Sequence, residues 1–305
     1  MPSGPRPVAV ELNAVLVALI DDEPQVLTLE EGALLPSGPF EGDHPTLQTG
    51  VRAWVERQTH HPLGYVEQLY TFADRYREST MGYRIVSISY LGLTRERAAA
   101  GQHEPGWQSF YRYFPWEDWR EGPPKILVRA VLPRLKGWVE AVADSARRER
   151  RQRVDGNFDI DAWNEELVLQ RYELLYEAGL VPEAGRPRKP VADPVPGEPM
   201  RYDHRRILAT GIARLRAKIK YRPVVFELMP PDFTLGQLQR AVEALAGRPL
   251  HKQNFRRQVE QQGLVEETGA STTGTGGRPA KLYRFRREIV LERAVAGSKL
   301  PLVRS

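Results

Sequence analysis

The stretch FTLGQLQRAVEALAGRPLHKQNFRRQVEQQ, residues 233–262, predicts two helices joined by a short turn. Thr234 can cap the first helix, and Gly247 lies in the turn that ends it. In the second helix, Phe255 and Val259 have the spacing of residues that face a core. A helix, a short glycine turn and a second helix form the supersecondary unit of proteins that read the major groove of DNA. The apolar face of the first helix is formed by Leu235, Leu238, Val242 and Leu245.

The second helix and the segment after it have the side chains expected of a DNA-binding surface. Arg or Lys pairs with guanine edges, Asn or Gln pairs with adenine edges, and the remainder can hold phosphates. Residues 264–288 predict two strands around a Gly, Ser and Thr loop, which is a β-wing; no helix opens after its GTGG, so a nucleotide-binding loop is not predicted. A winged domain for protein contacts is the alternative, but it would have little need for so many Arg. We predict DNA contacts from Thr234, Lys252, Gln253, Asn254, Arg256, Arg257, Arg278 and Lys281.

Charge is unevenly distributed along the chain. Residues 201–305 contain 21 Lys or Arg and 9 Asp or Glu, which leaves 23 basic and 30 acidic residues in residues 1–200. A basic end behind an acidic body indicates a module that meets a polyanion, because phosphate neutralisation supplies most sequence-independent affinity for nucleic acid. A solvated basic surface is the alternative.

Composition excludes several classes of site. The chain contains no Cys, so it has no disulfides, thiolate metal sites or Cys nucleophile. No zinc site is predicted from its six His. The longest apolar run near the start, residues 14–20, is too short for a membrane span, and MPSGPRP lacks the features of a signal peptide. We expect a cytoplasmic protein without a membrane partner.

The first 200 residues divide into a mixed block and a helical block. Strands are predicted at 8–21, 24–30, 64–74 and 83–94, with a helix at 46–59. Predominantly helical sequence runs from 124 to 184, with an interruption at VDGNFD, residues 154–159. Five Pro in residues 185–199 indicate an extended linker or a long exposed loop, and a strong helix follows.

The stretch GPFEGDHPTLQTGVRAWVERQT, residues 38–59, contains a Gly, a polar loop and a helix. It resembles the pattern of Nudix hydrolases, which is Gly, five residues, Glu, seven residues, Arg-Glu-apolar-any-Glu-Glu-any-Gly. Gly38, Arg52, Trp54 and Glu56 match this pattern in register. Its other positions are occupied by His44, Ala53, Arg57 and Thr59.

Three of the four carboxylates of that pattern are therefore missing. Metal-assisted hydrolysis needs several oxygens to hold a divalent cation between the phosphates and the attacking water. His44 and Arg57 place hydrogen-bond donors at two of these positions, so we expect a pocket that binds a diphosphate without a metal and without cutting it. Trp54 can stack on adenine or pack in a core, and a scaffold helix without a ligand is the alternative. The predicted ligand-binding residues are His44, Arg52, Glu56, Arg57, Asn13 and Tyr70.

Residues 200–285 resemble the end of the Nudix-related transcriptional regulators of NAD metabolism, with FTLGQLQ, NFRR and GRPAKLYRF as the specific motifs. The likeness is weaker over residues 8–118, and residues 123–199 depart from the shorter members. The resemblance implies a repressor of NAD biosynthesis or salvage genes that responds to ADP-ribose, NAD or ATP. The degenerate box and the long insertion resemble the alphaproteobacterial branch that governs de novo NAD synthesis.

We therefore predict an α+β fold, in which a Nudix-like α/β/α sandwich with a helical insertion precedes a winged helix-turn-helix domain. The predicted domains are an effector-sensing domain at 1–122, a helical insertion with a Pro-rich linker at 123–199, and a DNA-binding domain at 200–305. We expect a homodimeric repressor, not an enzyme, that binds a palindromic double-stranded DNA operator, responds to an adenine nucleotide and requires no cofactor. The helix at 205–218 would transmit the effect of the ligand.

Two rival functions remain. The first is a Nudix-type nucleotide-diphosphate hydrolase with an accessory nucleic-acid-binding domain, which the carboxylate count at 44, 53 and 57 disfavours. The second is a regulator that does not sense nucleotides and uses its N-terminal domain only to dimerise. A thermal shift with nucleotide distinguishes the second rival, because a ligand that binds only the folded state raises its stability.

Overall fold

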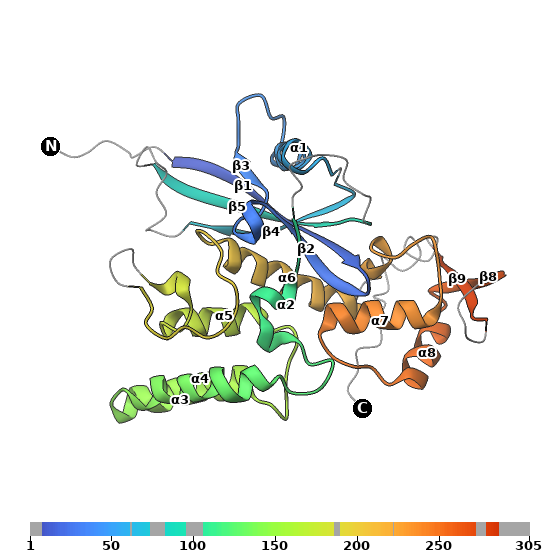
Figure 1. Ribbon diagram of the computed structural model, residues 1–305. Coiled ribbons are helices and arrows are strands. Elements are labelled where there is room, and N and C mark those ends of the chain that lie inside the picture. Colours follow the sequence, from blue (N-terminus) through green and yellow to red (C-terminus); the bar gives the residue numbers. More distant parts are fainter. Residues whose placement is uncertain are drawn as a thin grey trace.

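The computed structural model describes residues 8–61, 63–73, 83–95, 106–185, 190–221, 223–272 and 279–286. A six-stranded mixed sheet forms its N-terminal part (Figure 1), in the order β4-β5-β1-β2-β6 with β3 also paired to β1. β1 and β5 are parallel and the other pairs are antiparallel. The strands are β1 (Val8–Ile20), β2 (Glu23–Thr28), β3 (Ser37–Pro39), β4 (Tyr65–Phe72), β5 (Arg84–Leu93) and β6 (Gly106–Ser109).

Two helices cover the two faces of this sheet, α1 (Leu47–Thr59) and α6 (His204–Tyr221). Side chains along β1 alternate between them, because successive residues of a strand point to opposite faces. Leu12 shares a buried cluster with Val51 of α1, whereas Val15 belongs to the cluster that includes α6. The sheet is therefore the middle layer of a sandwich, as the resemblance to the Nudix hydrolases implied.

The insertion adds further helical layers below α6 (Figure 1): α5 packs on α6, α4 on α5, and α3 on α4. The predicted interruption at 154–159 is wrong, since α4 continues through Gly156 and ends at Phe158, whose ring is buried. The predicted mixed block also ended too early, because β6 adds an edge strand after Thr94. The elements are α2 (Phe110–Tyr113), η2 (Pro115–Glu117), η3 (Leu127–Val131), α3 (Leu132–Glu140), α4 (Asp144–Phe158), α5 (Val168–Glu177) and η4 (Pro182–Ala184).

Residues 190–199 have no helix or strand, but they are held against the body of the molecule. Val195 is buried, and its N–H donates to the Leu180 carbonyl at 2.7 Å. Asp193 accepts two hydrogen bonds from Arg134 of α3, at 2.6 and 2.9 Å. This part of the predicted linker is therefore packed, because its valine and its carboxylate both have partners on the insertion.

A compact C-terminal unit consists of two helices and a three-stranded sheet of order β7-β9-β8. The capping box of Thr234 and Gln237 starts its first helix, and Gly247 ends that helix with φ of 72°. Phe255 and Val259 are buried, as their spacing predicted. The elements are η5 (Val224–Glu227), β7 (Asp232–Phe233), α7 (Leu235–Ala246), α8 (Lys252–Gln261), β8 (Val265–Ser271) and β9 (Lys281–Phe285).

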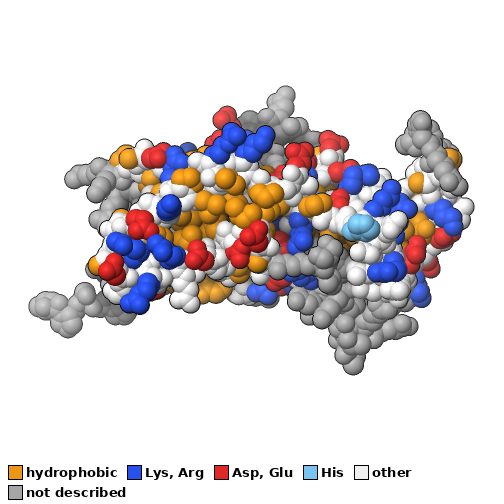
Figure 2. All heavy atoms as spheres, turned by 90° about the horizontal axis from the view of Figure 1, so that it is seen from below, with side chains coloured by type: hydrophobic (Ala, Val, Ile, Leu, Met, Phe, Trp, Pro, Cys, Tyr) orange, Lys and Arg blue, Asp and Glu red, His pale blue; other side chains and the backbone are white. Residues whose placement is uncertain are grey.

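The largest cluster of buried apolar residues runs through the whole molecule, with Val15, Tyr172, Leu215 and Leu238 among its members. It joins the sheet, the insertion helices and the C-terminal unit. Figure 2 shows an apolar area on the side of the insertion helices. Among the described residues, no helix is long and apolar enough to cross a membrane.

Candidate nucleic-acid interface and ligand sites

The outer face of α8 is polar and open to solvent. Phe255 and Val259 point into the core, and the side chains between and before them are exposed. Figure 2 shows Lys and Arg side chains at the end of the molecule where α8 lies and also over the insertion helices. This arrangement leaves an exposed group of hydrogen-bond donors and acceptors on one helix, which a major groove can accommodate. The exposed residues are Lys252, Gln253, Asn254, Arg256 and Arg257.

Two of these residues interact on the surface of α8. Arg257 donates a hydrogen bond from Nη2 to Oδ1 of Asn254, at 3.3 Å. The amide oxygen of Asn254 keeps a second lone pair, and its Nδ2 group can donate to a partner. Arg257 is oriented by the same contact, which favours reading of a guanine edge by its guanidinium group.

The two predicted residues of the wing and the cap differ in their surroundings. Thr234 accepts from the Gln237 N–H at 3.1 Å, so its hydroxyl stabilises the start of α7. Lys281 of β9 donates to both carboxylate oxygens of Glu267, at 2.8 and 3.0 Å. This hydrogen bond lowers the pKa of Glu267 and raises the pKa of Lys281. A phosphate at Lys281 would compete with Glu267. Arg278 lies outside the described residues.

On the opposite side of the molecule, His44 and Arg52 are engaged by nearby backbone. Nδ1 of His44 accepts from the Glu41 N–H at 3.1 Å, and the histidine side chain is 8% exposed. Arg52 donates to the carbonyls of Leu63 and Gly64 and ties the loop after α1 to the helix. Both residues therefore hold the local structure of the predicted box together.

Trp54 packs on the backbone at the first position of the box. A Cβ on Gly38 would lie 2.2 Å from the Trp54 ring, which explains the glycine there. The indole Nε1 donates to the Pro39 carbonyl at 2.8 Å, and the Arg57 guanidinium lies 4.5 Å from the ring centroid. The ring is therefore covered by Gly38 and Arg57, while Glu56 is exposed to solvent.

The loop before α1 places three possible metal ligands together. One ligand atom each from Glu41, Asp43 and His44 lies within 4.8 Å of the others. Glu41 and Asp43 are outside the register of the Nudix pattern, so counting carboxylates at the pattern positions did not include them. Oxygen and imidazole donors of this kind suit a divalent cation, although Nδ1 of His44 already accepts the Glu41 N–H.

Asn13 and Tyr70, the other two predicted ligand-binding residues, lie on a different face from α1. Asn13 has the same orientation as Val15, toward α6, and is 0% exposed. Neither Oδ1 nor Nδ2 of Asn13 has a hydrogen-bond partner among the described residues. Most buried polar groups are paired, so this amide is an exception among the described residues.

The surroundings of Asn13 are also polar. Ser89 of β5 is its lateral neighbour, is fully buried, and donates to the Tyr70 carbonyl at 2.8 Å. One step along, Ser87 donates to Glu11 at 3.1 Å. At the rim, Tyr70 is 59% exposed. The sequence analysis did not select Ser87, Ser89 and Glu11 as site residues. Strand alternation could have found them, because Glu11 lies two residues from Asn13 on β1, and Ser87 and Ser89 are the β5 partners of Glu11 and Asn13.

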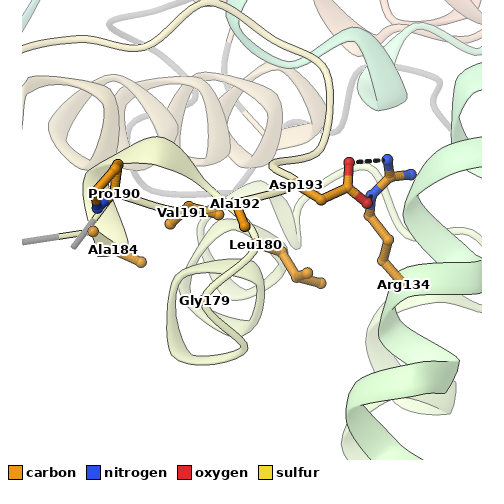
Figure 3. Close-up of a pocket in the computed structure, with 9 residues that line it drawn as sticks. Arg134, Gly179, Leu180, Ala184, Pro190, Val191, Ala192 and Asp193 are labelled. Carbon is orange, nitrogen blue, oxygen red and sulfur yellow. Dashed lines mark hydrogen bonds and ion pairs between the residues drawn. The ribbon is translucent and has the colours of Figure 1, made fainter.

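Two clefts in the structure involve other residues. A cleft of about 750 Å³ lies between α3, the end of α5 and residues 190–193, with the Arg134–Asp193 ion pair at its side (Figure 3). A smaller one of about 260 Å³ separates the β1–β2 turn from α7, where Arg240 pairs with Asp22 at 2.6 Å. None of the six predicted ligand-binding residues lines either cleft.

The C-terminal unit is similar to domains of known regulators. Residues 225–285 match the family model of the NrtR DNA-binding winged helix domain. An ADPR-responsive transcriptional repressor, NtrR, of Acinetobacter baylyi is 45% identical over 84 residues, which are 28% of this chain and 33% of the relative. The chain thus spans about a third of the length of that curated relative.

Solved structures extend the likeness to the whole fold. NrtR of Shewanella oneidensis in complex with a 27mer DNA has a TM-score of 0.51 and 22% identity, over 91% of this chain and 93% of that chain. A MutT/nudix family protein of Enterococcus faecalis has a TM-score of 0.52 and 16% identity, over 94% and 89%. At these identities the likeness establishes the fold alone. Residues 225–285 are therefore an NrtR-type winged helix domain, and the chain has the mixed helix and strand, Nudix-like fold that its sequence predicted.

Proposed function

We propose that this chain is a transcriptional repressor of NAD biosynthesis genes, that it binds a palindromic operator as a homodimer, and that an adenine nucleotide tunes its DNA binding. The observation that carries the proposal is the exposed polar face of α8 within an NrtR-type winged helix domain. The related repressor of Acinetobacter baylyi is named as ADPR-responsive, which makes ADP-ribose the first effector to test, before NAD and ATP.

The domain limits stay part of this proposal. Residues 1–122 would sense the effector, 123–199 would form the insertion, and 200–305 would bind DNA. A homodimer is proposed because two-fold symmetry in a regulator matches a palindrome with half-sites about one helical turn apart, or a multiple of it. α6 would connect the two functions, since it lies under the sheet and continues toward the winged helix domain.

A binding assay on selected DNA tests the function. The purified chain is used to select duplexes from a random pool, and the best duplex is then titrated at fixed salt with ADP-ribose, NAD or ATP present. We expect a palindromic site and, with one nucleotide, a change in affinity of about tenfold, within the usual range of coupling between two sites. Failure to enrich any duplex at low salt would contradict the proposal, since phosphate contacts are strongest there.

The same samples test the alternative that the chain is a nucleotide-diphosphate hydrolase. Each nucleotide is recovered after incubation with Mg²⁺ or Mn²⁺ and examined for cleavage of its diphosphate. We expect no cleavage, because only one of the four carboxylates of the Nudix pattern, Glu56, is present. Metal-dependent cleavage that disappears in Glu56→Gln or in Asp43→Asn would instead assign the chain to the hydrolases.

We place the effector on the α6 side of the sheet, with Asn13 as a direct contact. Asn13→Leu keeps the number and branching of the side-chain heavy atoms and removes a buried amide that has no partner among the described residues, whose burial costs about 1–3 kcal/mol. The variant is therefore expected to be as stable as the parent or more stable, yet to lose the thermal shift that the effector produces. Calorimetric titration with ADP-ribose measures the loss directly. An unchanged effector affinity in Asn13→Leu would exclude this location.

A matched variant on the other face distinguishes the two possible locations. Arg57→Gln removes the cation on Trp54 without disturbing the core, because Arg57 is exposed. If the effector lies along α1, as the resemblance to the Nudix box suggested, Arg57→Gln weakens binding and Asn13→Leu does not.

A further inference from the structure

The turn between α7 and α8 is anchored to the body of the molecule through backbone carbonyls. The last carbonyls of a helix have no partner within that helix. At the end of α7, three carbonyls accept hydrogen bonds from residues outside the winged helix domain. The pairs are Tyr111 Oη to Ala244 O at 2.5 Å, Arg216 Nε to Leu245 O at 3.0 Å, and Trp119 N to Gly247 O at 2.6 Å.

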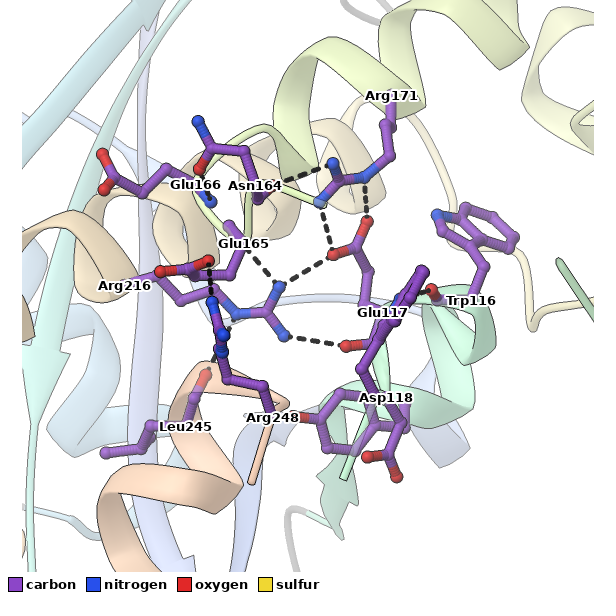
Figure 4. A network of polar contacts seen from close by, with 12 residues as sticks. Trp116, Glu117, Asp118, Asn164, Glu165, Glu166, Arg171, Arg216, Leu245 and Arg248 are labelled. Carbon is purple, nitrogen blue, oxygen red and sulfur yellow. Dashed lines mark hydrogen bonds and ion pairs between the residues drawn. The ribbon is translucent and has the colours of Figure 1, made fainter. Parts of the chain in front are cut away.

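The most buried of these donors, Arg216 of α6, is itself held in place. Its Nη1 donates to Oε2 of Glu117 at 2.8 Å, and its Nη2 to the Glu117 carbonyl at 3.2 Å. Arg171 of α5 approaches Glu117 from the other side with two hydrogen bonds, at 2.6 and 2.8 Å. Figure 4 shows the carboxylate between the two guanidinium groups. The insertion, the segment after the sheet and α6 therefore meet in one network next to the turn.

A second ion pair reaches the turn nearby. Arg248, the residue after Gly247, donates to Glu165 at 3.3 Å, and Lys220 of α6 pairs with the same carboxylate at 2.8 Å. Burial opposes ionisation of Glu165, but the hydrogen bond from Lys220 and the neighbouring cations hold the pKa of this carboxyl below its usual range. Glu165 is thus charged at neutral pH and attracts the turn toward α6.

Such a network costs desolvation free energy. The side chains of Glu117, Arg171 and Arg216 are at most 1% exposed. Buried ion triads are often no more stabilising than apolar residues of the same volume, and in some proteins buried polar groups select one geometry among several. Hydrogen bonds from fixed guanidinium groups are directional, so they define where the turn lies more narrowly than apolar packing does.

We propose that Glu117, Arg171 and Arg216 are positioning residues that set the orientation of α8 relative to the sheet. The proposal rests on the proposed function, because a fixed orientation matters when two copies of α8 must meet two half-sites at one spacing. It also gives α6 a specific part in regulation. α6 lies on the sheet face where Asn13 is found, and its Arg216 is hydrogen-bonded to the turn that precedes α8. A small displacement of α6 would therefore change the distance between the two copies of α8 in a dimer.

The test compares single half-sites with the complete operator. Arg216→Met keeps most of the buried volume and removes the hydrogen bonds to Leu245 O and to Glu117. Tyr111→Phe removes the hydroxyl that donates to Ala244 O. Both variants are expected to bind a single half-site within about twofold of the parent, and the complete operator about tenfold more weakly, because a loosely held second α8 has a lower effective concentration at its half-site. A series of operators with base pairs inserted between the half-sites is expected to show a broader spacing optimum for the variants.

Arg134→Met is the matched control, since it breaks an Arg–carboxylate pair on the insertion that does not touch the winged helix domain. It is expected to bind all duplexes as the parent does. Parental affinity of Arg216→Met for the complete operator, or an equal loss on half-site and operator, overturns the proposal. If Arg216→Met fails to fold, Tyr111→Phe decides by the same comparison. A parent chain that binds no duplex contradicts the proposed function instead.

Discussion

Alanine at Arg256 or Arg257 is expected to abolish operator binding at physiological salt while leaving effector binding unchanged. Both side chains are exposed on α8 and have no part in the core. One base-reading arginine contributes about 1–3 kcal/mol, and a symmetric dimer loses this contribution at both half-sites. A loss of about a hundredfold is therefore expected for each variant, measured by fluorescence anisotropy on the selected operator.

Arg256 and Arg257 are expected to differ in whether they contact a base edge or a phosphate. Arg257 is oriented by Asn254, so Arg257→Ala should relax the base preference at one position of each half-site. A residue that contacts phosphate instead weakens binding to all sequences and lowers the salt dependence. Arg148→Ala provides the control, because Arg148 is also exposed but lies on α4 of the insertion. Equal operator affinity for the parent and the α8 variants would refute the assignment of α8 as the recognition helix.

Alanine at Gly247 is expected to give the largest loss of stability. Gly247 has φ of 72°, a conformation that costs other residues about 1–2 kcal/mol. A Cβ there would also lie 2.4 Å from the Glu117 carbonyl oxygen and 2.6 Å from Nη2 of Arg216. Because a backbone oxygen cannot move away cheaply, the turn must shift, and we expect a loss of about 3 kcal/mol or more, as other overpacked sites show. Urea unfolding measures it.

Gly236→Ala is the matched control on the same helix. A Cβ at Gly236 would meet its nearest neighbours at 3.6 and 3.7 Å, which is ordinary contact. Replacing a helical glycine by alanine gains about 0.5–1 kcal/mol where the conformation permits it, so a small gain is expected. If Gly247→Ala is as stable as the parent, the close approach of the turn to Glu117 and Arg216 is not present in solution.

Local sequence signals predicted most of the elements correctly. Thr234 and Gln237 cap α7 because a capping box needs only residues three apart. The apolar and β-branched residues at 8–21 predicted a strand, and β1 spans Val8–Ile20. Predictions were wrong where a distant contact decided. α4 extends through Gly156 because burial of Phe158 favours the helical end, and residues 190–199 are packed because Leu180 and Arg134 bind them.

The amino-acid sequence by itself determined the two-helix unit with its wing and the uneven charge, because spacing, caps and composition are local, whereas the sandwich of the N-terminal part was implied by the resemblance to the Nudix hydrolases. Only the tertiary structure decided that Asn13 is buried with no hydrogen-bond partner in the described part of the chain, and that Asn13 and His44 lie on opposite sides of the sheet. It also decided that Arg171 and Arg216 meet at Glu117, across separations of 54 and 99 residues. No periodicity encodes such contacts, since they depend on how packed layers bring remote side chains together.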